Sequence, residues 1–154
     1  MVMRMRSSFA AIIFALVLAA PADAGWEATQ WGMSPNEAMA VLDGAVQYPP
    51  QSKEIHEHAG KKYAPLIKLS HAVEGVSGQT LLLFDVDRKL RYVMFNPTEI
   101  GSCDSLVEAL TSRYGVPHAM SAGKINISDW SHGAEAIKLT KVGSTVCNLS
   151  YSAK

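Results

Sequence analysis

The sequence predicts an α+β domain in which two helices pack on one face of an antiparallel sheet of about six strands. Two amphipathic segments, at 34–44 and 102–114, carry helix start and stop signals. Each is followed by three short segments rich in apolar and β-branched residues, which favour strands. The 130 residues from Gly25 to Lys154 have the length of a single domain.

Residues 1–24 have the three parts of a cleavable secretory signal peptide. Arg4 and Arg6 form a basic start, residues 9–20 are an uncharged apolar run, and the small residues of Pro21–Ala24 predict cleavage after Ala24. A retained membrane anchor is the alternative, but the run is shorter than the about 20 residues that a spanning helix needs. We therefore expect a periplasmic or secreted protein without a membrane span after cleavage.

The first helix is expected to begin at Ser34, which can cap it, with Pro35 at the first position and Glu37 completing a capping box. Gly44 is expected to end this helix. The second helix is expected over 102–114, where Gly115-Val116-Pro117 stops it.

Residues 44–62 are polar and interrupted by two prolines, so they predict a loop. Strands are expected after it, at 63–72, 80–86, 90–95, 125–131, 134–141 and 145–152. In the last of these, Cys147, Leu149 and Tyr151 alternate with polar residues and share one face.

The order of a helix and three strands, twice, suggests a tandem helix-plus-three-strand repeat. The pattern Ser34-x-x-Glu37 recurs 71 positions later as Ser105-x-x-Glu108, and two further short matches follow in the same order. The alternative is two independent capped helices, each followed by a meander, and the sequence leaves both open.

The chain has two cysteines, Cys103 and Cys147. Because exported proteins meet an oxidising compartment, we expect these two to form a disulfide bond. The alternative is a nucleophilic Cys103 near a helix start, with His118 or His132 as its base.

Charge and motifs exclude several classes of function. Beyond residue 24 the chain has 12 basic and 13 acidic residues, which is not the basic footprint of a nucleic-acid-binding protein. The sequence has no Gly-x-Ser-x-Gly motif, no phosphate-binding glycine loop and no dinucleotide fingerprint. It therefore favours a protein that is not an enzyme and needs no cofactor.

The segment Glu54–His58 contains the pattern His56-Glu57-His58. Two histidines at this spacing share one side of an extended chain, and His71 could complete a zinc or copper site. Two lysines follow closely, and a solvated loop is the alternative interpretation. A periplasmic metal-binding protein is accordingly the alternative function.

Three tryptophans, Trp26, Trp31 and Trp130, are the candidate binding residues, because exposed large aromatic side chains mark interaction sites. The alternative is that they pack across the sheet.

The segment Trp31-Gly32-Met33-Ser34-x-x-Glu37 resembles the Gly-Met-Ser/Thr helix start of small exported bacterial envelope proteins. These include the outer-membrane assembly lipoproteins and the β-lactamase inhibitory protein. The segment 106–117 resembles a helix end of uncharacterised secreted bacterial proteins. The chain lacks the acylated cysteine of the lipoproteins. The resemblance implies a non-enzymatic protein-binding module, an assembly factor or inhibitor, whose partner is another envelope or secreted protein.

Overall fold

The computed structural model describes residues 25–154, so the predicted signal peptide lies outside the described residues. These residues form one antiparallel sheet in the order β1-β3-β4-β5-β9-β8-β7-β6, with β2 pairing β3 off this path. The elements in chain order are α1 (Pro35–Val41), β1 (Val46–Gln47), η1 (Ser52–Glu54), β2 (His56–His58), β3 (Lys61–Val73), β4 (Val76–Phe84), β5 (Leu90–Pro97), η2 (Ile100–Ser102), α2 (Cys103–Tyr114), β6 (His118–Ala122), β7 (Ile125–His132), β8 (Glu135–Val142) and β9 (Val146–Ala153).

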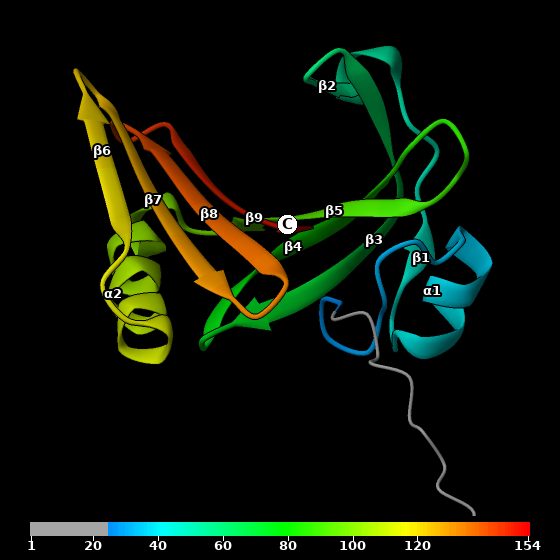
Figure 1. The fold of residues 1–154 in the computed structure, drawn as a ribbon, viewed down its shortest axis with the longest axis horizontal. Coiled ribbons are helices and arrows are strands. Elements are labelled where there is room, and N and C mark those ends of the chain that lie inside the picture. Colours follow the sequence, from blue (N-terminus) through cyan, green and yellow to red (C-terminus); the bar gives the residue numbers. More distant parts are fainter. Residues whose placement is uncertain (1–24) are drawn as a thin grey trace, which may run out of the picture.

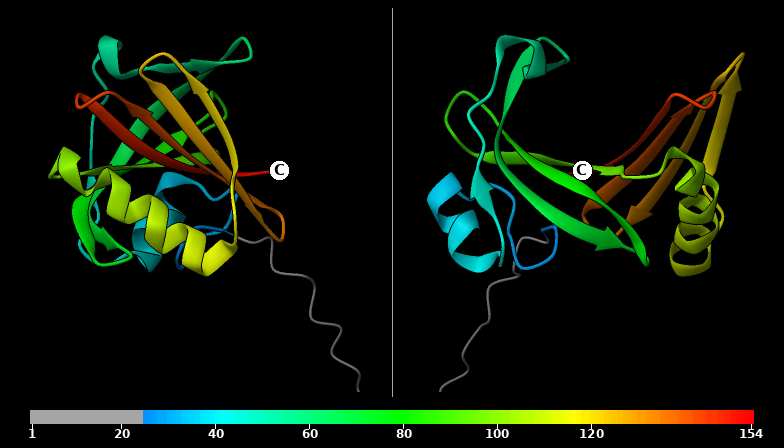
Figure 2. Two further views of the ribbon diagram at one scale, coloured as in Figure 1. Left: turned by 90° about the vertical axis from the view of Figure 1, so that its left-hand side faces the viewer. Right: turned by 180° about the vertical axis from the view of Figure 1, so that it is seen from behind.

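The sheet bends into two wings that meet where β5 pairs with β9 (Figure 1). One wing contains β3 and β4 with helix α1 beside them, and the other contains β6, β7 and β8 with helix α2. The rear view shows the two helices at opposite ends of the molecule (Figure 2, right). Among residues 25–154, no helix combines the length and the apolarity needed to cross a membrane.

The predicted sheet of about six strands with two helices on one face is wrong. The described residues form nine strands, and α1 contacts β3 at one end of the sheet while α2 contacts β7 at the other. The strands missing from the prediction are β1, β2 and β6. Each pairs with one other strand, so its side chains do not alternate between core and solvent, and the sequence shows no period of two.

The predicted tandem repeat of one helix and three strands is also wrong, because edge strands were missed in both halves of the chain. Five strands follow α1 and four follow α2, because the presumed loop at 44–62 contains β1 and β2, and β6 precedes the C-terminal meander.

The N-terminus of α1 has the capping box predicted from the sequence. The backbone N–H of Ser34 donates to Glu37 Oε2 at 2.7 Å, and the N–H of Glu37 donates to Ser34 Oγ at 3.4 Å. The helix ends at Val41, three residues before Gly44, because Leu42 is already extended.

The core lies between the sheet and the two helices. Its largest fully buried side chains are Phe84, Phe95, Ile67, Leu82, Leu83, Leu90, Leu106, Leu110, Ile137, Leu139, Leu149 and Val93. Cys103, at the start of α2, is bonded to Cys147 of β9, with the Cα atoms 5.8 Å apart. Since both sulfur atoms are bonded, this structure leaves no thiolate for a nucleophilic Cys103.

Candidate functional site

The face of β6–β9 that points away from the core carries an apolar patch. Residues directly opposite each other on paired antiparallel strands lie on the same face. The registers of β6 with β7, β7 with β8 and β8 with β9 therefore align six apolar residues there. We call the following residues the apolar patch: Met120, Ala122, Ile125, Ile127, Val142 and Val146.

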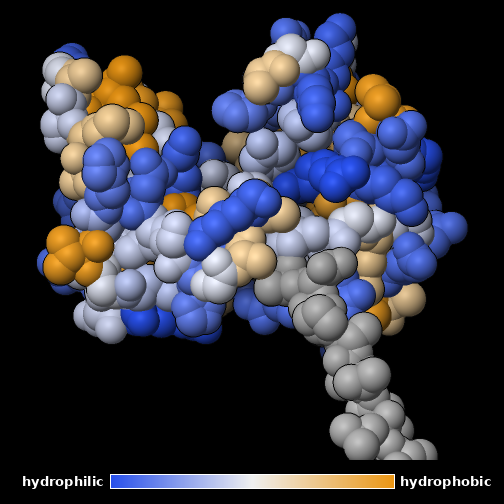
Figure 3. Space-filling model, viewed as in Figure 1, coloured by the Kyte–Doolittle hydropathy of each residue, from blue (hydrophilic) through white to orange (hydrophobic). Residues whose placement is uncertain are grey.

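Four of the six residues of this patch are exposed, among them Ala122 and three large side chains. The exposed fractions are 50% for Met120, 43% for Ile125 and 41% for Val146. Figure 3 shows the corresponding apolar surface over the upper ends of β6–β9, beside an open groove between the two wings. A contiguous exposed apolar surface of this kind is typical of an interaction site.

Strand β6 adds an open sheet edge to the apolar patch. It pairs with β7 and has no second neighbour among the described residues, and all five of its side chains are exposed. Proteins commonly block such edges with lysine, proline or a bulge. The sequence His118-Ala119-Met120-Ser121-Ala122 contains no lysine, arginine, acidic residue or proline. Its outer backbone groups are therefore available to another strand.

The groove between the wings has an aromatic floor. The rings of Tyr63 and Tyr92 meet edge to face with centroids 4.8 Å apart, and His58 of β2 lies 6.1 Å from Tyr92. A hollow of about 230 Å³ here is lined on one side by β2 and on the other by Lys138 and Thr140 of β8.

The floor of the groove is uncharged at neutral pH. Burial raises the pKa of the Tyr92 hydroxyl, and the adjacent Tyr63 raises it further. On the wall formed by β8, the positive charge of Lys138 has a negative partner in β7. Lys138 Nζ lies 4.0 Å from Asp129 Oδ1. One acidic residue, Glu57, and one basic residue, Lys138, line the hollow beside these rings.

The structure separates the three histidines of the predicted metal site. His56 and His58 lie on β2 beside the groove. His71 lies on β3, with its ring 5.0 Å from Trp26 and its Nε2 atom 3.3 Å from Glu27 Oε1. Within residues 25–154, no group of three His, Cys, Asp or Glu side chains is arranged to hold a metal ion. The pattern His56-Glu57-His58 is strand β2, which forms a short antiparallel hairpin with the start of β3.

The three candidate tryptophans are parts of the core rather than of an exposed surface. Trp26 is 4% exposed and Trp130 is 5% exposed, while Trp31 is partly buried and packs against the core. This burial corresponds to the alternative that they pack across the sheet.

Neither the apolar patch nor the open edge of β6 was predicted from the sequence. Small residues and a histidine give β6 no strand signal, and Val142 and Val146 read as strand ends. The available signal was the alternation of Ile125 and Ile127, which lie on one face of β7, with Ile125 exposed and Ile127 half-buried.

Comparison with known proteins adds one distant similarity. No protein-family model matches the chain, and no curated protein matches it. Among solved structures, it is similar to a DUF4309 family protein (YjgB) from Bacillus subtilis, with 9% sequence identity and a TM-score of 0.44. The similarity covers 79% of this chain and 78% of the other.

Proposed function

We propose that this protein is a non-enzymatic binding module that takes up an extended segment of another exported protein along β6. The observation that carries the proposal is the coincidence of an unblocked edge strand with the apolar patch on the same strands. The expected export, and the partner class implied by the resemblance to envelope proteins, agree with it.

An added strand would use the two features together. Its backbone would pair with the free edge of β6, and every second side chain would lie beside Met120 and Ala122, extending the apolar patch by one strand. The backbone hydrogen bonds would supply affinity for any extended chain, whereas the patch would select apolar residues at alternate positions.

A second copy of this protein fits the surface less well. Its own β6 would present His118, Met120 and Ala122 on the relevant face, and only Met120 is a large apolar side chain. A partner strand with several large apolar residues covers more of the patch, and the hydrophobic contribution grows with the apolar area buried.

Selection from a library of displayed peptides tests this proposal with the oxidised exported protein as bait. We expect enrichment of extended peptides with apolar residues at alternate positions. Hydrogen exchange of the β6 amides should slow when a selected peptide is bound. Met120→Glu should weaken binding by about tenfold or more, because it places a charge in the apolar contact.

The matched control is Ala119→Glu, which adds the same charge to the same strand on the opposite face, and its affinity should stay within about twofold of the wild type. Equal weakening by both variants, or none by Met120→Glu, would contradict the proposal. A dimer that Met120→Glu dissociates would identify a second copy as the occupant and would also overturn it.

A further inference from the structure

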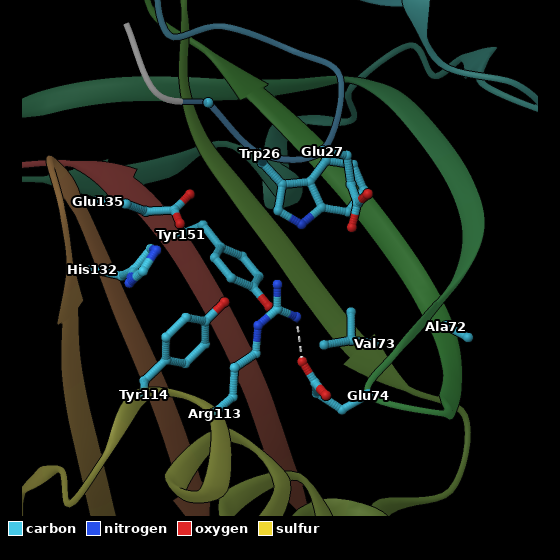
Figure 4. Close-up of a pocket in the computed structure, with 11 residues that line it drawn as sticks. Trp26, Glu27, Ala72, Val73, Glu74, Arg113, Tyr114, His132, Glu135 and Tyr151 are labelled. Carbon is cyan, nitrogen blue, oxygen red and sulfur yellow. Dashed lines mark hydrogen bonds and ion pairs between the residues drawn. The ribbon is translucent and has the colours of Figure 1, made fainter.

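A polar pocket of about 410 Å³ lies on the opposite face of the sheet from the apolar patch. Figure 4 shows its lining residues, which come from the segment before α1, the β3–β4 turn, the end of α2, the β7–β8 turn and β9. The pocket is within the size range of small-molecule sites. The function proposed above does not use it.

Negative charge predominates in this pocket. Glu27, Glu74 and Glu135 line it together with one guanidinium group, that of Arg113. Arg113 Nη1 lies 2.5 Å from Glu74 Oε1, so these two charges largely cancel. Glu27 faces His71, which is a weaker partner because an imidazole is charged only when protonated. An anionic ligand would therefore meet uncompensated carboxylates.

Glu135 is the carboxylate without a partner. Its Oε1 atom is buried and accepts no hydrogen bond among residues 25–154. Burial raises the pKa of this carboxyl, and Glu27 adds to the rise while Arg113 opposes it. Figure 4 shows the carboxyl turned toward Tyr151 and Trp26, into the pocket. A buried acceptor without a donor is costly and calls for a group that donates to it.

Aromatic rings form the remaining walls. Trp26 and Tyr151 have centroids 6.5 Å apart, and Tyr114 lies beside His132 at 5.3 Å. The faces of such rings attract cations, and the attraction is strongest where water is excluded. The Arg113 guanidinium lies 5.2 Å from the Tyr114 ring centre.

We propose that this pocket binds an alkylammonium ion, with the ammonium group donating to Glu135 and its carbon chain lying against Trp26 and Tyr151. A hydrogen bond from a charged donor to a carboxylate is stronger than a hydrogen bond between two neutral groups. The rings favour an organic cation over a metal ion, because they contribute no ligand atoms of the kind that a metal requires. Free amines and lysine side chains share this chemistry.

Titration calorimetry of the oxidised exported protein tests the inference, with 1,5-diaminopentane and N-acetyl-lysine methylamide as probes. We expect saturable binding of at least one probe. Binding of the diamine alone identifies a free amine as the ligand, and binding of the lysine derivative identifies a lysine side chain. The neutral analogue 1,5-pentanediol should not bind, because it lacks the positive charge.

Glu135→Gln should weaken binding of the probe by about tenfold or more, since it removes the charge that the ammonium meets. Glu108→Gln is the matched control, an exposed glutamate on α2 outside the pocket, and it should bind like the wild type. If Glu135→Gln does not fold, Glu27→Gln, at the exposed rim, serves in its place with a smaller expected loss. Absence of saturation at about 10 mM probe, equal binding of the diol, or unchanged affinity of the folded pocket variant would overturn the proposal.

Discussion

The indole Nε1 of Trp130 donates a hydrogen bond to the carbonyl oxygen of Gly115 at 2.9 Å. Gly115 follows the last residue of α2, and Trp130 lies in β7, so this bond fixes the end of the helix to the sheet. The segment between them contains β6, the edge strand of the proposed binding surface. The position of that edge therefore depends on Trp130, which is buried and does not itself form part of an exposed binding surface.

Trp130→Phe is expected to lower the free energy of unfolding by about 2 kcal/mol, because it removes the hydrogen bond and leaves unfilled space. Urea unfolding measures this change. Hydrogen exchange at β6 should accelerate more than exchange at β4. Uniform acceleration across the sheet would show that Trp130 does not position β6 specifically.

Gly78 in β4 is expected to tolerate no side chain. A Cβ atom there would lie 2.4 Å from Asn96 O and 2.5 Å from Phe95 Cζ, closer than real contacts allow. Gly78→Ala should therefore cost about 2 kcal/mol or more of stability in thermal or urea unfolding. The control is Gly101→Ala, where nothing lies within 4 Å of the new atom. A similar loss for both variants would contradict the packing explanation.

Removal of the Cys103–Cys147 bond is expected to lower the free energy of unfolding by about 2–4 kcal/mol, because the bond restricts the unfolded chain. The double variant Cys103→Ala/Cys147→Ala and the reduced wild type should unfold at similar urea concentrations. Intact mass of the protein, purified without reductant, should correspond to the loss of two hydrogens. Detection of two free thiols would refute the predicted disulfide.

Asp85 should make stability depend on pH at the acidic end. Burial acts to raise the pKa of its carboxyl, but the bonds from Arg91, Lys89 and Asp87 outweigh this and hold the pKa below its ordinary value of 3.8. Its contribution is thus present above about pH 4 and is lost as the pH falls through the lowered value. Asp85→Asn should cost about 1–2 kcal/mol at pH 7 and little near pH 2.

Urea unfolding of both proteins at these two pH values measures the effect. Asp87→Asn, on the same turn, is the control and should show a small difference at either pH because its side chain is exposed. A difference for Asp85→Asn that does not shrink on acidification would contradict the assignment.

The contribution of Glu135 to stability should depend on pH in the direction opposite to that of Asp85. Burial raises the pKa of its carboxyl above the ordinary 4.5, so the folded state binds the proton more tightly than the unfolded state. The favourable contribution is present below pH 4.5 and is lost as the pH rises through the raised value. Glu135→Gln should therefore gain stability relative to the wild type between pH 4 and pH 7. Melting temperatures across this range check the sign, and a constant difference would contradict it.

Local signals in the sequence determined the start of α1, and they also predicted the core-facing side of β9. Ser34 and Glu37 interact within one turn, and Cys147, Leu149 and Tyr151 follow the strand period. These features depend on neighbours in the chain and on burial of one face, which composition and spacing express directly.

The tertiary structure alone decided the number of strands, the separation of His71 from His56 and His58, and both proposed surfaces. Edge strands such as β6 need no apolar alternation, because neither of their faces must be buried. The polar pocket joins residues as distant as Trp26, Glu74, Arg113 and Tyr151, and the pairing of β5 with β9 brings the two halves of the chain together. Such contacts depend on chain topology, which no local pattern of side chains specifies.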